Sequence, residues 1–100
     1  MKSKPVEYLP GAQLDVEESA AWYEEQEPGV GDRFHAAVEM TEQKVRRNPQ
    51  FGAPHRRTTR KRRVARFPHN LIYREEAERI VVIAVAHAKR REEYWDYRLD

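Results

Sequence analysis

The sequence has no cysteine, only four glycines and no long hydrophobic run among its 100 residues. The absence of cysteine excludes a disulfide framework, a thiolate metal site and a cysteine nucleophile. No apolar stretch reaches the roughly 18 residues of a membrane span, and residues 1–5 lack the apolar core of a secretion signal. A chain of this length has room for one modest hydrophobic core. We therefore expect residues 1–100 to form a single cytoplasmic domain that does not enter a membrane.

Charge is plentiful but unevenly distributed. The formal net charge is only +2, although Asp, Glu, Lys and Arg make up 36% of the chain. Residues 1–50 carry 6 basic and 10 acidic side chains, whereas residues 51–100 carry 13 and 7. The extremes are 15–27, with six acidic and no basic residues, and 56–66, with seven basic and no acidic ones. The basic half predicts a polyanion or an acidic protein as partner, the alternative being a merely solvated surface.

The first half of the chain has helical periodicity. Apolar residues between Gly11 and Glu27 recur at intervals of three and four, and Pro28-Gly29 then ends the pattern. A second stripe runs from Asp32 to Asn48-Pro49. We expect Gly11 and Asp32 to cap the two helices, which the short linker folds into a hairpin. In the first helix Tyr23 is expected in the core, and Trp22 is left open.

The remaining elements are expected to be strands. A short strand between Pro5 and Pro10 would lie at or near an edge. A basic strand follows at Thr58–Phe67, then a strand at Leu71–Arg74 and a run without polar residues at Ile80–Ala86, which must be covered on both faces. Together these patterns predict an α+β fold in which the helical hairpin packs on a small antiparallel sheet.

Candidate chemistry is limited to histidine and basic residues. The chain has none of the common phosphate-loop, dinucleotide, nucleophile-elbow or zinc-protease motifs. Its four histidines show no metal-binding spacing, so we expect no metal and no cofactor. His87 ends the apolar strand beside a basic stretch, a position suited to acid–base chemistry on a phosphodiester or, alternatively, to capping of the strand end.

The basic strand can present only part of its charge to one site. Alternation places Arg60, Arg62 and Arg66 on one face and Lys61 and Arg63 on the other. Such a strand would make phosphate contacts that tolerate any nucleic-acid sequence. The alternative is an edge strand that its charges protect from aggregation.

Several blocks of the sequence, taken together, resemble a known toxin family. They are Trp22-Tyr23, Pro28-Gly29-x-Gly31-x-Arg33-Phe34, Asn48-Pro49, Arg66-Phe67-Pro68-His69-x-Leu71-Ile72-Tyr73 and His87-x-x-Arg90-x-x-x-Tyr94-Trp95-x-x-Arg98. From about residue 5 to about residue 98 the chain is similar to the RelE/ParE superfamily of toxins from type II toxin–antitoxin systems. The resemblance implies elements in the order β-α-α-β-β-β and a growth-inhibiting bacterial toxin, with a role in plasmid stabilization. It also implies a cognate antitoxin that covers the basic half.

The family divides by target. RelE-like members cut mRNA on the ribosome without a metal, whereas ParE-like members inhibit DNA gyrase and need no nuclease site. Ala88 stands where ribosome-dependent members often have a basic residue, which favours the ParE-like interpretation. A third alternative, from another class, is a non-toxic basic module that binds nucleic acid or protein. The residues that the resemblance implies are, if the chain is RelE-like, His87, Arg90 and Tyr94 as catalytic groups, and Arg60, Lys61, Arg63, Arg66 and Arg91 as nucleic-acid- or antitoxin-binding groups.

Overall fold

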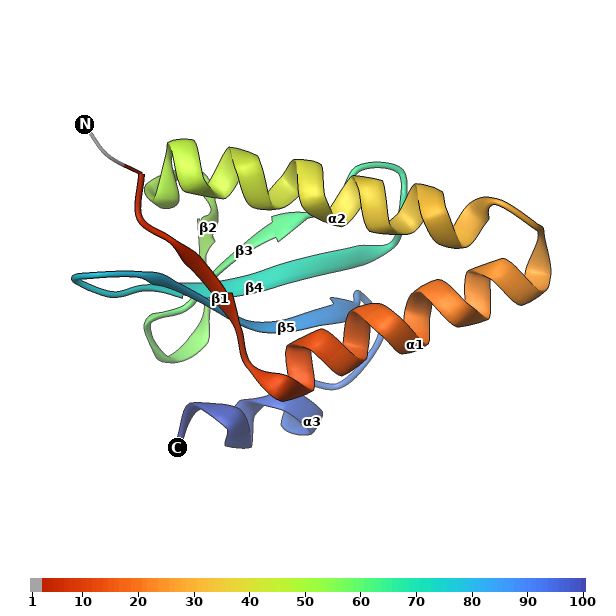
Figure 1. Ribbon diagram of the computed structural model, residues 1–100. Helices are drawn as coiled ribbons and strands as arrows, with labels where there is room; N and C mark the ends of the chain where they lie inside the picture. The colour runs from red at the N-terminus through yellow and green to blue at the C-terminus, as the bar shows by residue number, and fades with distance from the viewer. Residues whose placement is uncertain (1–2) are drawn as a thin grey trace.

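The computed structural model describes residues 3–100, which form a five-stranded sheet with helices on both faces (Figure 1). Helices α1 (Pro10–Gln26) and α2 (Val30–Arg47) form a hairpin over one face, and the short helix α3 (Glu93–Asp96) packs against the other. The strands are β1 (Val6–Tyr8), β2 (Ala53–Pro54), β3 (Arg60–Arg63), β4 (His69–Glu75) and β5 (Ile80–His87). This architecture confirms the predicted α+β class. No helix within the described range has the length and hydropathy needed to span a membrane.

The sheet has the strand order β1-β5-β4-β3-β2 and is mixed. The predicted antiparallel pairing holds for β3, β4 and β5, and the two-residue strand β2, which the sequence did not predict, pairs antiparallel with β3. The edge strand β1 differs, because it runs parallel to β5 with Val6 opposite Ile80 and Tyr8 opposite Val82. The parallel direction lets the Leu9 N–H bond to the Val82 carbonyl at 3.0 Å and starts α1 along β5, where the helix buries its apolar stripe.

Both helix starts differ from the prediction. Pro10 takes the first position of α1, where its missing N–H costs nothing, so Gly11 lies inside the helix and is not its cap. Gly29, with a left-handed φ of 92°, precedes α2, and Asp32 lies within the first turn instead of capping it. The Glu24 carboxylate accepts hydrogen bonds from the Gly29 and Gly31 N–H groups at 3.0 Å, which supplies the anion that a helix N-terminus favours.

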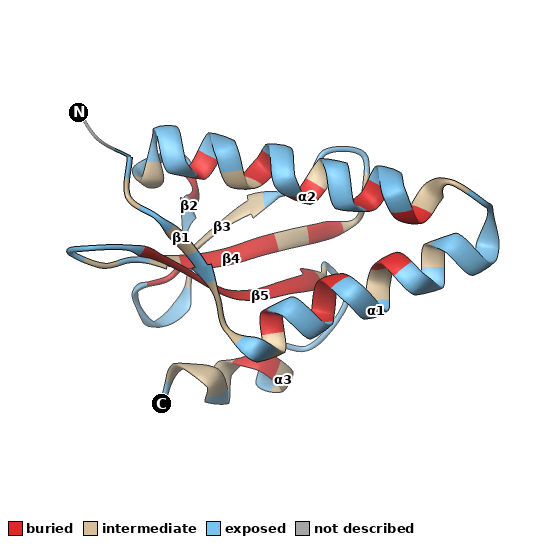
Figure 2. Cartoon of the chain, viewed as in Figure 1, coloured by how far each residue is buried: buried red, intermediate tan, exposed pale blue. Residues whose placement is uncertain are grey.

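Two apolar clusters hold the layers together (Figure 2). Phe34 and Val38 of the hairpin pack on one face of the sheet, and Trp95 of α3, only 1% exposed, packs on the other. Residues of β5 alternate between the two clusters, and the register shift beside Ile72 places the consecutive residues Ile83 and Ala84 in the second cluster. The prediction that the apolar run is covered on both faces is confirmed. The second face is covered by the C-terminal segment, residues 88–100, which includes α3.

The basic strand is shorter than predicted. β3 comprises only Arg60–Arg63, because Arg57 and Thr58 adopt left-handed backbone angles (φ 53° and 63°) that an extended strand does not contain. Arg66, also left-handed at φ 69°, lies in the turn before β4. The expectation that Arg66 shares a strand face with Arg60 and Arg62 is therefore wrong.

Candidate functional site

Two histidines face each other where β4 begins and β5 ends. His69 is the register partner of His87, and their ring centroids are 5.2 Å apart. His69 is buried, and this burial, aided by the neighbouring charges of His87 and Arg63, lowers its pKa to about 4. The imidazole of His69 is consequently neutral at physiological pH. The sequence analysis did not find this pair, because no local sequence pattern reveals the strand register that aligns two residues 18 positions apart.

The geometry of His87 defines its tautomer. Its Nδ1 accepts the backbone N–H of Lys89 at 3.1 Å, so Nε2 is the ring nitrogen that carries a proton. The next turn is held by the Ala88 N–H, which donates to the Pro68 carbonyl at 2.8 Å. The hydrogen bond by which His87 was expected to cap the strand end is thus present. The role of His87 in acid–base chemistry stays a prediction.

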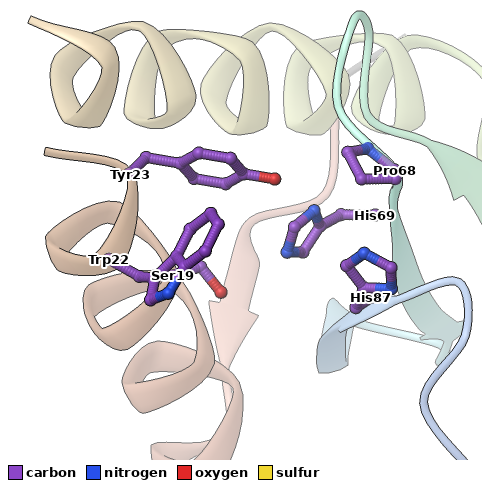
Figure 3. Close-up of a pocket in the computed structure, with 6 residues that line it drawn as sticks. All are labelled: Ser19, Trp22, Tyr23, Pro68, His69 and His87. Carbon is purple, nitrogen blue, oxygen red and sulfur yellow. The ribbon is translucent and has the colours of Figure 1, made fainter. Parts of the chain in front are cut away.

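A cavity of about 540 Å³ opens beside this pair (Figure 3). Trp22 and Tyr23 line it from α1, and His69, His87 and Pro68 line it from the sheet end. Tyr23 packs against the rings of Phe34 and Phe67 at centroid distances of 5.4 and 5.0 Å, which agrees with its predicted place in the core. Trp22 remains 57% exposed.

The three candidate catalytic residues lie together in a smaller cavity of about 70 Å³. The Arg90 guanidinium lies 3.8 Å from the centre of the Tyr94 ring, and His87 lines the same space. Asp15 and Glu18 line it too, and the Tyr94 hydroxyl is 3.4 Å from an Asp15 carboxylate oxygen. Burial, reinforced by Asp15, raises the pKa of Tyr94 to about 12, so this phenol is un-ionised at neutral pH.

The predicted binding cations do not form one surface. Arg60 is on the hairpin side, where it donates to the carbonyls of Gln50 (3.2 Å) and Gly52 (2.9 Å). Lys61 is on the other side, in a cavity of about 60 Å³ that it shares with Arg90 and Glu92. This division of Arg60 and Lys61 confirms the predicted alternation within β3.

Arg63, Arg66 and Arg91 lie at the same end of the sheet. The Arg63 Nε–H donates to the Phe67 carbonyl at 2.9 Å. Arg66 and Arg91 are exposed, and neither takes part in an ion pair among residues 3–100. These three guanidinium groups therefore keep their charge available to a partner.

Two further arginines are neutralised within the chain. Arg56 and Arg57 make ion pairs of 2.6–3.2 Å with carboxylates of the C-terminal segment. The carboxylates belong to Glu92, Asp96 and Asp100, which are spaced four residues apart and so share one helical face. Sequence reasoning missed this network, although the acidic spacing was a usable signal. It reduces the charge that the basic segment offers to an outside polyanion.

A buried ion pair fastens the C-terminal segment to α1. The Arg98 guanidinium contacts Asp15 at 2.8 Å and donates to the Ile83 carbonyl at 3.0 Å. The same carboxylate accepts the Val85 N–H at 3.1 Å. Both side chains are about nine-tenths buried. Asp15 and Arg98 thereby satisfy backbone groups of β5 beyond the end of β1.

The helical hairpin on a small sheet, with aromatic, histidine and arginine side chains gathered at one sheet end, agrees with the fold that the resemblance to the RelE/ParE toxins implies. The chain belongs to the family described as ParE toxin of type II toxin–antitoxin system, parDE, whose model matches residues 6–92. No curated protein matches the sequence.

Two solved structures show the same fold. A chain of the chromosomal ParDE system from P. aeruginosa has a TM-score of 0.76 and 13% identity, covering 85% of this chain and 96% of that one. A chain of the toxin–antitoxin complex RelBE2 from Mycobacterium tuberculosis has a TM-score of 0.60 and 24% identity, covering 86% and 99%. The chain is thus similar in fold to proteins of both branches.

Proposed function

We propose that this chain is the growth-inhibiting toxin of a type II toxin–antitoxin pair, that it acts as a ParE-like inhibitor of DNA gyrase, and that a cognate antitoxin neutralises it in the cytoplasm. Family membership supports the toxin assignment. The choice of target rests on the surroundings of the candidate nuclease residues, and the antitoxin on the charge of the second half.

The observation that carries the choice of target is the presence of carboxylates in the cavity that His87, Arg90 and Tyr94 share. A phosphodiester placed there would meet Glu18, which makes no ion pair among residues 3–100, beside Asp15, which is paired with Arg98. The negative charge of a phosphate close to these carboxylates is unfavourable, the more so where water is scarce. A ribonuclease needs the opposite, cations gathered around the developing negative charge. This arrangement supports an inhibitor that acts by binding a protein.

The antitoxin is expected to be acidic. Residues 51–100 carry 13 basic and 7 acidic side chains, and some of these carboxylates are already paired with Arg56 and Arg57. The cations left for a partner include Lys61, Arg63, Arg66 and Arg91. A disordered acidic segment that folds onto this surface would satisfy them.

A second candidate function is the RelE-like cleavage of mRNA. One observation favours it, namely that His87, Arg90 and Tyr94 line the same cavity. In that case His87 would transfer protons, Arg90 would stabilise charge and Tyr94 would orient the substrate.

Expression of the chain in bacteria without an antitoxin separates these functions. Gyrase inhibition predicts growth arrest, an induced DNA-damage response and intact mRNA, and the purified protein should block supercoiling by purified gyrase. The variant Tyr94→Phe should arrest growth like the wild type, as should the exposed control Tyr97→Phe. Codon-phased mRNA cuts that Tyr94→Phe abolishes, while Tyr97→Phe keeps them, would instead establish the ribonuclease. Normal growth with folded protein would contradict both and leave a non-toxic binding module.

A further inference from the structure

We infer that the 540 Å³ cavity between α1 and the sheet end receives an apolar or aromatic anchor side chain from an acidic segment of the antitoxin. This inference rests on the proposed function and deepens it, because it names the place of contact and the chemistry of the contacting segment. Neither the family match nor the two related structures assign a role to this cavity in the chain.

The walls of the cavity are already in place. Tyr23 is fixed between Phe34 and Phe67, and Trp22 packs edge-on against Tyr23 at 5.2 Å with an interplanar angle of 80°. Figure 3 shows these two α1 rings on one side of the space and Pro68 on the other. A partner therefore pays little entropy to order them, and large rigid aromatics in such a position dominate binding energy in known interfaces.

The inner side of the cavity is polar. The ring of His69 projects into it in Figure 3 and is 5% exposed. Its Nδ1 is buried and has no hydrogen-bond partner among the described residues. A buried polar atom of this kind is unusual in a folded protein and costs free energy. Since His69 is neutral at physiological pH, an uncharged anchor side chain fits beside it better than a charged one.

The charge around the cavity favours an acidic peptide over a nucleic acid. Exposed cations flank the sheet side of the cavity along the chain, since Arg66 lies two residues before Pro68 and Lys89 two residues after His87. The α1 side belongs to the 15–27 segment, which has six acidic and no basic residues. A peptide can direct its carboxylates toward the cationic side alone. A nucleic acid carries a phosphate at every step and would also meet the acidic helix.

Affinity for the antitoxin measures the contribution of this cavity. We would titrate the purified antitoxin encoded by the adjacent reading frame into the full chain and its variants. Trp22→Ala should weaken binding about 30-fold, as expected for a central aromatic anchor. Leu14→Ala is the matched control, because Leu14 lies on the same helix, is 52% exposed and does not line the cavity. It should change affinity less than twofold.

Fluorescence gives an independent readout at the same residue. Of the two tryptophans, Trp95 is buried and Trp22 is exposed, so docking at the cavity should shift the emission of the wild type to shorter wavelength. The variant Trp22→Phe keeps an aromatic wall and should bind within about threefold while losing the shift. Raising the salt concentration should weaken wild-type binding more than binding by Arg66→Ala.

The outcomes separate this inference from the proposed function. If the wild type arrests growth and binds the antitoxin, but Trp22→Ala binds it equally well, the cavity inference is wrong and the toxin assignment stands. If the wild type neither arrests growth nor binds the antitoxin, the proposed function fails together with the inference. Blue-shifted emission with a single-stranded oligonucleotide and not with the antitoxin would overturn the inference that an antitoxin peptide occupies the cavity. It would identify nucleic acid as the occupant.

Discussion

The buried contact between Asp15 and Arg98 gives the sharpest prediction of stability. Asp15→Ala removes the carboxylate from an ion pair of 2.8 Å and from the Val85 N–H, and it leaves the Arg98 guanidinium buried without a counter-charge. Removing one partner of a buried pair costs about 3–5 kcal/mol of the free energy of unfolding. With a urea dependence of about 2 kcal/mol per molar, the unfolding midpoint should fall by about 2 M. Emission from the buried Trp95 reports the transition.

A double-mutant cycle decides whether the pair itself is responsible. Arg98→Met in the Asp15→Ala background should cost little more, because it removes the unpaired cation, and the coupling free energy should exceed about 1 kcal/mol. Glu17→Ala, on the exposed side of the same helix, should change stability by less than about 0.5 kcal/mol. The reasoning is refuted if Asp15→Ala costs less than 1 kcal/mol, or if the two substitutions add without coupling.

Two further predictions concern the histidine pair and the helical hairpin. The folded state holds the pKa of His69 at about 4 against an ordinary value of 6.5, so the unfolded state takes up the proton first. About 3 kcal/mol of the free energy of unfolding, present above pH 6.5, should be lost as pH falls through 4. His69→Gln should flatten the plot of urea midpoint against pH in this range, whereas the exposed control His35→Gln should leave it as in the wild type. An unchanged slope in His69→Gln would contradict the prediction. Gly31→Ala would place a Cβ 2.8 Å from the Ala20 carbonyl oxygen and should lower the free energy of unfolding by about 1–3 kcal/mol, measured against exposed Ala36→Ser. Equal thermal midpoints for Gly31→Ala and Ala36→Ser would show that the hairpin can separate at no cost.

The layers of the fold were predictable because their signals are periodic. The helical stripes and the apolar Ile80–Ala86 run specify which faces must be buried, and the structure buries them. The helix caps were not predictable in the same way. Glu24 reaches the start of α2 only after the hairpin has closed, so its advantage over Asp32 depends on tertiary structure.

The site was only partly predictable for the same reason. Sequence reasoning selected His87, Arg90 and Tyr94, and the structure brings them into one cavity. It did not find that His69 is the strand partner of His87, since pairing register is decided by packing across the sheet. It also overestimated the free charge of the basic segment, because Arg57 is matched by carboxylates some 40 positions later in the chain.

The buried Asp15–Arg98 contact has a consequence for the way in which any protein can bind this chain. Beyond the short β1, the Ile83 carbonyl and the Val85 N–H on the outer side of β5 are occupied by these two side chains. At the opposite edge, β2 has two residues, and one of them, Pro54, has no N–H to donate. Along these two stretches the sheet offers few free backbone groups to an added strand. A partner strand that paired with β5 beyond β1 would first have to displace the Asp15 and Arg98 side chains.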